Sequence, residues 1–206
     1  MTQSNAVPGF VPSVHGLHFS NRFPPGPTLR FGLLDPRLVG IGDAAAGLCG
    51  GMCWFVRERF EAVVPVPPDT VAPANGSPLF RSIVRNQILS LDWFRGPLRF
   101  WWMGLRSDAW RRERTLTVEW PRIRRAIDSG RLPLVGLVRH TGWSPWHLSQ
   151  SHQVLAFAYA IDDAGTITLR LYDPNWPNRD DVSIRLGPDG FSQATGERLL
   201  GAIALN

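Results

Sequence analysis

The sequence predicts an α+β protein whose helices come first along the chain and whose antiparallel strands come second. Apolar residues recur at helical spacing between about residues 47 and 130, whereas the chain from 131 onward consists of short β-forming runs separated by turns. No internal repeat or linker divides the 206 residues. Because segregated helices and strands pack as layers around one core, we expect a single domain with a helical lobe at 47–130 and a β lobe at 131–206.

The first 46 residues are rich in Pro and Gly and contain isolated aromatic residues such as Phe10, Phe19 and Phe23. Frequent Pro and Gly residues interrupt both helical and strand patterns. We therefore expect residues 1–46 to form an extended arm laid over the surface rather than a separate domain.

The first predicted helix runs from Gly50 to about Val63. Met52, Cys53, Val56 and Phe60 supply its apolar face, with charged residues between them. A Pro-rich run at 63–73 ends this helix.

A second helix is predicted to start at Ser77–Pro78, because Ser suits the N-cap and Pro the first helical position. A third is predicted from about Val118 to Ser129, followed by Gly130 at the usual place of a left-handed C-terminal cap. The pattern at 97–110 assigns neither helix nor strand.

The β lobe is predicted from short runs of β-forming residues with turn sequences between them. The run at 166–173 (TITLRLYD) alternates between apolar and polar residues, which indicates a strand with one buried face. The turns include DDAG at 162–165 and GPDG at 187–190. The strand runs lie at 133–139, 152–161, 166–173, 181–186 and 201–206.

The charge of the chain is +5, and all 22 basic residues are arginines. They are scattered, with small clusters at 111–114 and 122–125 that are typical of solvated helix faces, so we expect no nucleic-acid partner. No apolar run approaches 18 residues and the N-terminus lacks a secretory pattern, so we expect no membrane span and a cytoplasmic location. Export without an N-terminal signal, as an effector, stays open. We expect no cofactor, and the cysteines and histidines lack the spacing of a zinc site.

The only two cysteines, Cys49 and Cys53, lie one helical turn apart in the segment GLCGGMCW at 47–54. Thiols at i and i+4 of one helix do not meet with disulfide geometry. Cys49 stands where the helix begins, where the macrodipole favours a thiolate and unpaired N–H groups could hold an oxyanion. Gly50 would let a substrate backbone approach the sulfur. Cys53 is predicted to be a buried core thiol.

A thiolate nucleophile needs a base and a group that orients the base. His152 heads a predicted strand and Asp173 ends the next strand, and each lies about ten residues from the turn at 162–165. If these strands form a hairpin, its register places His152 beside Asp173. Cys49, His152 and Asp173 are therefore the candidate catalytic residues.

Four segments of the chain carry a resemblance to a known family: GLCGGM at 47–52, the run at 119–139, SHQVLAFAY at 151–159 and LYDPNWP at 171–177. With the order of its elements, the chain resembles the papain-like cysteine peptidase superfamily, most closely a group of bacterial papain-like proteins with Cys-Gly-Gly-Met, His-Gln-Val-Leu and Tyr-Asp-Pro-Asn motifs. The resemblance spans about residues 11–186. It implies a papain-like fold and a thiol-dependent hydrolase, with Cys49, His152 and Asp173 at the triad positions.

Papain-like enzymes keep a Gln six residues before the nucleophile as an oxyanion donor, and Asp43 occupies that place here. An ionised carboxylate would repel an oxyanion, so either Asp43 is protonated or it caps the helix while Gln153 or Gln150 donates. Trp146 and Trp176 are candidates for lining a substrate cleft, and Trp176 for shielding the His–Asp pair from water; the alternative is that they belong to the core.

The resulting hypothesis is a cysteine peptidase or amidase that cleaves a peptide, protein or other amide substrate through a thioester. A transglutaminase-like acyl transferase differs only in its second nucleophile. A catalytically inactive papain-like binding module is the third alternative.

Overall fold

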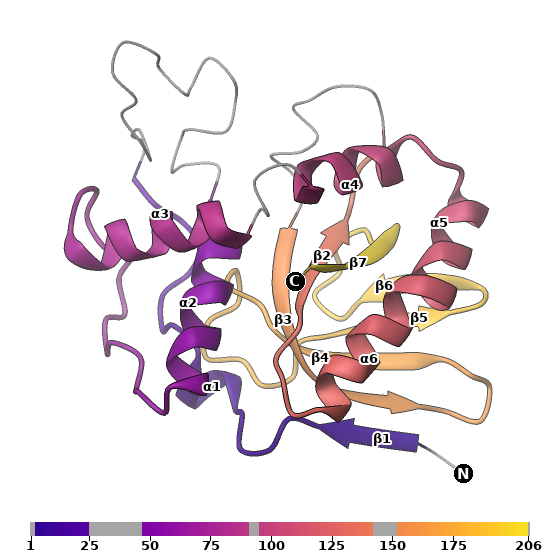
Figure 1. The fold of residues 1–206 in the computed structure, drawn as a ribbon, viewed down its shortest axis with the longest axis horizontal. Coiled ribbons are helices and arrows are strands. Elements are labelled where there is room, and N and C mark those ends of the chain that lie inside the picture. Colours follow the sequence, from indigo (N-terminus) through magenta and orange to yellow (C-terminus); the bar gives the residue numbers. More distant parts are fainter. Residues whose placement is uncertain (1–2, 25–46, 91–94, 142–151, 206) are drawn as a thin grey trace.

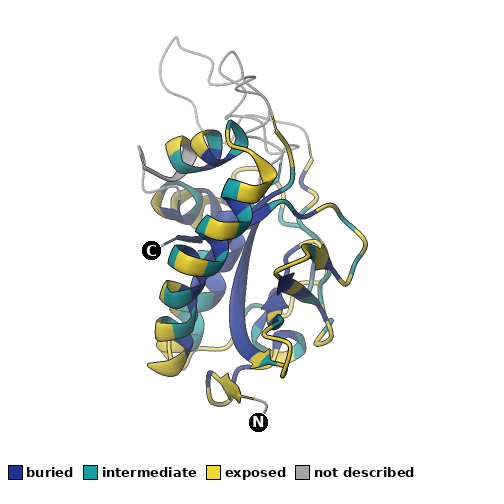
Figure 2. Ribbon diagram, turned by 90° about the vertical axis from the view of Figure 1, so that its right-hand side faces the viewer, coloured by how far each residue is buried: buried dark blue, intermediate teal, exposed yellow. Residues whose placement is uncertain are grey.

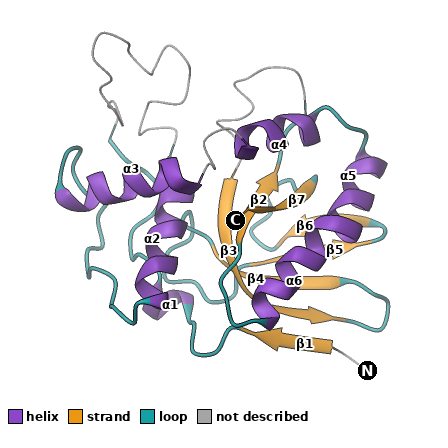
Figure 3. Ribbon diagram, in the orientation of Figure 1, coloured by secondary structure: helices purple, strands orange, loops and turns teal. Residues whose placement is uncertain are grey.

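The structure is a computed structural model that describes residues 3–24, 47–90, 95–141 and 152–205. From residue 47 onward the helices come first and the strands second, as predicted, and one unpredicted strand, β1 (Gln3–Ala6), precedes the helices (Figure 3). None of the helices in these ranges is long and apolar enough to cross a membrane. The helical elements are α1 (Pro12–His15), α2 (Cys49–Glu61), α3 (Pro78–Ser90), α4 (Arg95–Gly104), α5 (Asp108–Arg114), the π-helix η3 (Thr115–Glu119) and α6 (Trp120–Asp128). The strands are β1 (Gln3–Ala6), β2 (Leu134–Val138), β3 (His152–Ile161), β4 (Ile167–Tyr172), β5 (Ser183–Gly187), β6 (Gly190–Gln193) and β7 (Gly201–Leu205).

The strands form one antiparallel sheet in the order β6-β5-β4-β3-β2-β7, and it curls into a half-barrel (Figure 1). The first half of β3 pairs with β2, while its second half pairs with β1 on the same edge. From Leu155 to Ile161 the other edge of β3 pairs with β4, and the first eight residues of β3 are buried. This long central strand carries His152 at its start and gives it a rigid support.

The described part of the arm, residues 3–24, is built into the core rather than only laid over the surface. Phe10, Phe19 and Phe23 are buried, and Phe10 packs edge-on against Phe60 of α2 with ring centroids 5.0 Å apart. Strand β1 was not expected before the helices, and it departs from the predicted segregation of the halves. It forms because the second half of β3 has an open edge on the β2 side, which the arm pairs with.

Helices α2 and α3 pack closely against each other, and α2 also packs on β3. The closeness depends on Gly51, because a Cβ built there would lie 2.2 Å from the backbone oxygen of Ile83 in α3. The inner face of α2 includes Met52, Cys53 and Val56, all with no exposed surface. The start of α2 is thereby held against the start of β3.

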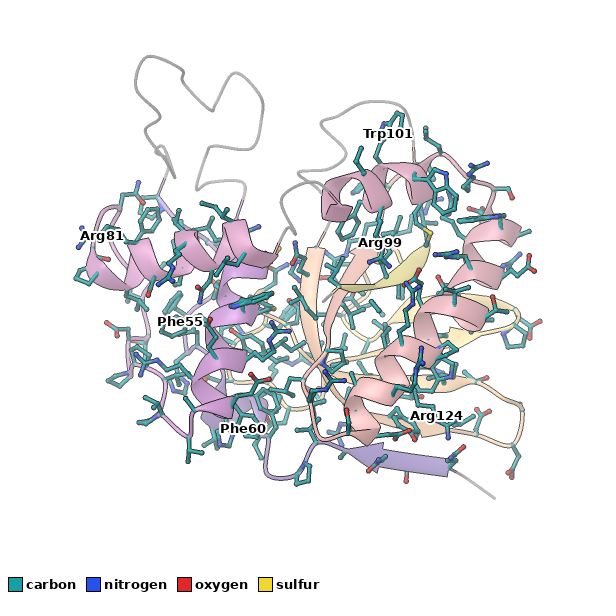
Figure 4. All side chains as sticks on the ribbon, viewed as in Figure 1. Phe55, Phe60, Arg81, Arg99, Trp101 and Arg124 are labelled. Atoms are coloured by element: carbon teal, nitrogen blue, oxygen red, sulfur yellow. The ribbon has the colours of Figure 1, made fainter. Side chains whose placement is uncertain are left out.

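Helices α4 and α6 lie on the sheet, over β2, β7 and β3, and the ambiguous region 97–110 is resolved into α4 and α5. Their outer faces are exposed while β3 behind them is buried (Figure 2). Arg99 points from α4 toward β7, where it donates to the Ala204 carbonyl (Figure 4). Most of the helical segment 95–128 thus covers the sheet, and α2 with α3 forms a separate pair beside it.

Candidate active site

Three elements bring the candidate catalytic residues together. Cys49 is the first residue of α2, His152 is the first residue of β3, and Asp173 directly follows β4. Strands β3 and β4 are antiparallel neighbours with Leu155 opposite Tyr172, and the bulge between Ala156 and Ala158 lies nearer the turn. In this register His152 and Asp173 are diagonal neighbours on one face of the hairpin. The predicted hairpin is therefore present, and it joins the two side chains.

His152 and Asp173 form a short, buried pair. The Nε2 atom of His152 lies 2.6 Å from Oδ1 of Asp173, and the residues are 5% and 1% exposed. The backbone N–H of Asn175 donates to the same carboxylate oxygen at 2.9 Å. Burial alone would raise the pKa of Asp173, but the charge and hydrogen bond of His152 outweigh it and lower that pKa below its ordinary value. Asp173 is therefore an ionised orienting group.

On the other side of the His152 ring lies the thiol of Cys49, close enough for each group to shift the pKa of the other. Since Nε2 is engaged by Asp173, the nitrogen left for the sulfur is Nδ1. Burial favours the neutral thiol, but the hydrogen bond and charge of His152 lower the pKa of Cys49 below its ordinary value. Burial also opposes the charged imidazole, yet Asp173 and Cys49 raise the pKa of His152 to about 9. Both shifts act in the direction that favours a thiolate–imidazolium pair.

Gly50 and Gln153 complete the surroundings of the sulfur. The backbone N–H groups of both residues act on Cys49 in the direction that lowers its pKa and favours its thiolate. A Cβ on Gly50 would lie 2.3 Å from the Ser90 hydroxyl and 2.5 Å from Oε1 of Gln153, so this position has no room for a side chain. The Gln153 side chain is buried, and its Oε1 has no hydrogen-bond partner among the residues that the structure describes. Gly50 therefore serves close packing at the site.

Cys53 lies one turn further along α2 in a different environment. It has no exposed surface, and its thiol donates to the Gln153 carbonyl at 3.4 Å. Burial raises the pKa of Cys53 well above its ordinary value. Cys49, by contrast, is partly exposed. The two sulfurs are therefore clearly different: Cys49 is accessible and acidic, and Cys53 is a neutral core thiol.

Of the remaining predicted site residues, the structure describes only Trp176. Trp176 is half-buried in the turn after Asp173, where its backbone N–H donates to the Asp173 carbonyl and its indole N–H donates to Glu197 at 3.3 Å. It packs against the core cluster. Asp43, Trp146 and Gln150 lie outside the residues that the structure describes.

Asn21 supports the site from the arm. Its side-chain oxygen accepts from the backbone N–H of Leu48, and its own backbone N–H donates to Pro174. Gln87 of α3 supports the same helix start by accepting from the N–H of Gly51 at 2.7 Å. We did not predict either role, because the partners are distant in sequence and no local pattern links them.

Two further side chains, those of Gln193 and Arg139, continue the hydrogen bonds beyond Asp173. Gln193 donates to Oδ2 of Asp173 at 3.3 Å and accepts from Arg139 at 2.9 Å. Gln193 was not predicted from the sequence, because no predicted strand or motif includes it. Among the residues that the structure describes, no group of three His, Cys, Asp or Glu side chains could hold a metal ion.

Comparisons of the chain with models of protein families, with curated proteins and with solved structures found no match. A partly exposed thiol at a helix start, with an imidazole beside it and a carboxylate behind the imidazole, has the groups needed to attack a carbonyl carbon and to protonate the group that leaves.

Proposed function

We propose that this protein is a thiol hydrolase that cleaves an amide or peptide bond through an acyl-enzyme at Cys49. The observation that carries the proposal is the linked arrangement of Cys49, His152 and Asp173, in which the partly exposed member is the sulfur. The lowered pKa of the Cys49 thiol and the raised pKa of His152 support it.

In the first step, the Cys49 thiolate attacks the substrate carbonyl carbon and the carbonyl electrons move onto oxygen. The start of α2 supplies N–H groups that have no partner within the helix, which suits a developing oxyanion. The N–H of Gly51 is not one of these donors, because it already binds Gln87. The imidazolium of His152 then gives its proton to the leaving amine as the C–N bond breaks.

In the second step, water attacks the thioester while neutral His152 accepts its proton. The C–S bond breaks, the acid product leaves, and the thiolate–imidazolium pair is restored. Asp173 holds the imidazole in one tautomer and orientation throughout, because its Oδ1 binds Nε2 and leaves the other nitrogen facing the sulfur.

The first test is site-specific alkylation with iodoacetamide at pH 7, followed by peptide mass spectrometry. We expect Cys49 to react faster than free cysteine, and Cys53 to react far more slowly. Cys53→Ala is the matched control and should keep the fast reaction, whereas His152→Ala should lose it. Labelling of Cys49 no faster than that of free cysteine would overturn the proposal and favour an inactive binding module.

The second test uses p-nitrophenyl acetate as a generic acyl donor. We expect a burst of p-nitrophenol stoichiometric with enzyme, followed by turnover in water, and neither in Cys49→Ala. An acyl-enzyme that persists in water but clears when an amine is added would assign acyl transfer in place of hydrolysis.

A further inference from the structure

The side chains of Arg139, Gln193, Asp173 and His152 form one continuous chain of hydrogen bonds. Arg139 donates to Oε1 of Gln193 at 2.9 Å, Gln193 donates to Oδ2 of Asp173 at 3.3 Å, and Asp173 binds His152 at 2.6 Å. Gln193 and Asp173 are buried, with 6% and 1% exposure, so water does not compete freely for these bonds.

The orientation of the Gln193 amide is set by its two partners. An arginine side chain only donates and an ionised carboxylate only accepts. The carbonyl end of the amide must therefore face Arg139 and the NH₂ end must face Asp173, and a flipped amide would lose both bonds. The Gln193 amide is thus held in one orientation between the Arg139 guanidinium and the Asp173 carboxylate.

The curl of the sheet makes this chain possible. Gln193 ends β6, at one end of the strand order, while Arg139 follows β2, four strands away. In a flat sheet those strands would be roughly 19 Å apart at the usual spacing of about 4.8 Å. The 2.9 Å bond between the two side chains therefore crosses the concave side of the half-barrel, next to the end of β4.

We propose that Gln193 and Arg139 are positioning residues of the active site, which hold the Asp173 carboxylate ionised and aligned with His152. The inference rests on the proposed function for its catalytic meaning. Because the neutral Gln193 amide lies between Arg139 and Asp173, Oδ1 of Asp173 stays bound to His152 and to the Asn175 N–H. A direct contact with arginine would compete with His152 for the negative charge of the carboxylate.

The other charged and titratable groups around Asp173 are consistent with this role. Arg139 acts on Asp173 in the direction that lowers its pKa. Cys53 and Tyr172 are also near Asp173, but the pKa of each is raised well above its ordinary value by burial, so both stay neutral. Glu197 is the second carboxylate near Arg139.

The test follows the low-field proton resonance of His152 Nε2 by NMR during acidification of the full chain. This resonance reports the bond to ionised Asp173, is assigned by its loss in Asp173→Asn, and does not depend on turnover. A carboxylate with a lowered pKa keeps the bond to low pH and loses it on protonation. In Gln193→Met and in Arg139→Gln we expect Asp173 to bind a proton about three- to tenfold more tightly, so that the resonance is lost at higher pH.

Two matched controls are available on exposed positions, Ser192→Ala beside Gln193 and Arg198→Gln as an equal loss of charge. Both should retain the wild-type profile. Gln193→Met removes both bonds of the Gln193 amide, whereas Arg139→Gln removes the guanidinium and keeps the bond from Gln193 to Asp173. Circular dichroism shows which of the two variants is folded. A wild-type profile in a folded test variant, or the same shift in Arg198→Gln, would overturn the inference.

The result is separable from the proposed function. If Cys49 proves unreactive but the resonance shifts as expected, the hydrolase proposal falls and the positioning chain stands. If Cys49 is activated but neither variant moves the profile, the positioning inference fails alone.

Discussion

The side-chain oxygen of Asn21 accepts a hydrogen bond from the backbone N–H of Leu48 at 2.6 Å, immediately before the nucleophile candidate Cys49. The same Asn21 reaches the turn after Asp173, because its backbone N–H donates to Pro174 and its amide to Asn175. One residue of the arm therefore connects the segment that carries the thiol to the segment that carries the carboxylate. Through these bonds of Asn21, the arm forms an integral part of the domain.

Replacing Asn21 should weaken both stability and reactivity. In Asn21→Ala the N–H of Leu48, a buried residue, loses its partner, which we expect to cost about 1–3 kcal/mol in the free energy of unfolding. Cys49 alkylation should slow several-fold because the helix start is less well held. Urea denaturation and the alkylation rate measure the two effects.

Asn21→Asp is the matched control, since it keeps the acceptor for Leu48 and removes only the donor to Asn175. It should retain more stability than Asn21→Ala. Equal losses in the two variants would show that the bond to Leu48 does not matter.

The two glycines after Cys49 should respond to alanine against the usual rule. Gly→Ala inside a helix normally gains about 1 kcal/mol. At Gly51 the new Cβ would meet a backbone oxygen of α3 at 2.2 Å, and such overpacking costs about 1–3 kcal/mol, so Gly51→Ala should be destabilising. Thermal unfolding checks the sign, and a higher melting temperature would contradict the packing argument.

Gly50→Ala meets side chains rather than backbone, namely Ser90 and Gln153. It should reduce Cys49 alkylation, because Gln153 must move and its backbone N–H helps to lower the pKa of Cys49. The double variant Gly50→Ala/Ser90→Ala removes one of the two clashes and should recover part of the rate. No recovery would mean that Ser90 is not the limiting contact.

The rate of Cys49 alkylation should rise at a lower pH than for a free thiol. The thiolate is the reactive form, and the His152 interaction lowers the pKa of Cys49. In His152→Ala, burial is the main remaining influence on the pKa of Cys49. The rise in alkylation rate should therefore move to a pH above that of an ordinary thiol. Stopped-flow alkylation across pH 4–10 on the Cys53→Ala background isolates the one thiol; coincident profiles would contradict the ion pair.

The rate of hydrolysis of an amide should also fall at alkaline pH. The imidazolium of His152 is the acid that protonates the leaving amine, and its pKa is raised to about 9. The acylation rate with an amide substrate should therefore fall as pH rises through about 9. In Asp173→Asn this limb should move to lower pH, because the carboxylate that helps to raise the His152 pKa is gone.

Glu119 should be the most sensitive charged residue of the scaffold. It is 2% exposed and pairs with Arg99 at 2.8 Å and Arg114 at 3.1 Å, and it also accepts from the backbone N–H of Ala204. Glu119→Ala should cost about 1–3 kcal/mol, because it leaves the buried N–H of Ala204 without its acceptor while the partly exposed arginines can turn to water. Arg122→Ala removes only an exposed contact at 3.6 Å and should cost less than about 1 kcal/mol. Chemical denaturation of both variants measures this contrast.

Much of the fold was predictable because it depends on local patterns. Apolar spacing predicted α2, the Ser-Pro pair predicted the start of α3, and the turn at 162–165 predicted the β3–β4 hairpin. The pattern at 97–110 was not decisive, since its bulky aromatic residues suit either state; packing of α4 against β2 and β7 decided it. The pairing of β1 with β3 was missed, because a strand of four exposed residues has no buried face to reveal it.

The sequence by itself determined where Cys49, His152 and Asp173 stand on their elements, because helix starts and hairpin registers follow from residues that are near in the chain. The tertiary structure alone decided what surrounds them. Asn21 reaches Leu48 across 27 residues, and Arg139 reaches Gln193 across 54. Such contacts depend on how the arm folds back and how far the sheet curls, and both result from the packing of the whole core rather than from any local pattern.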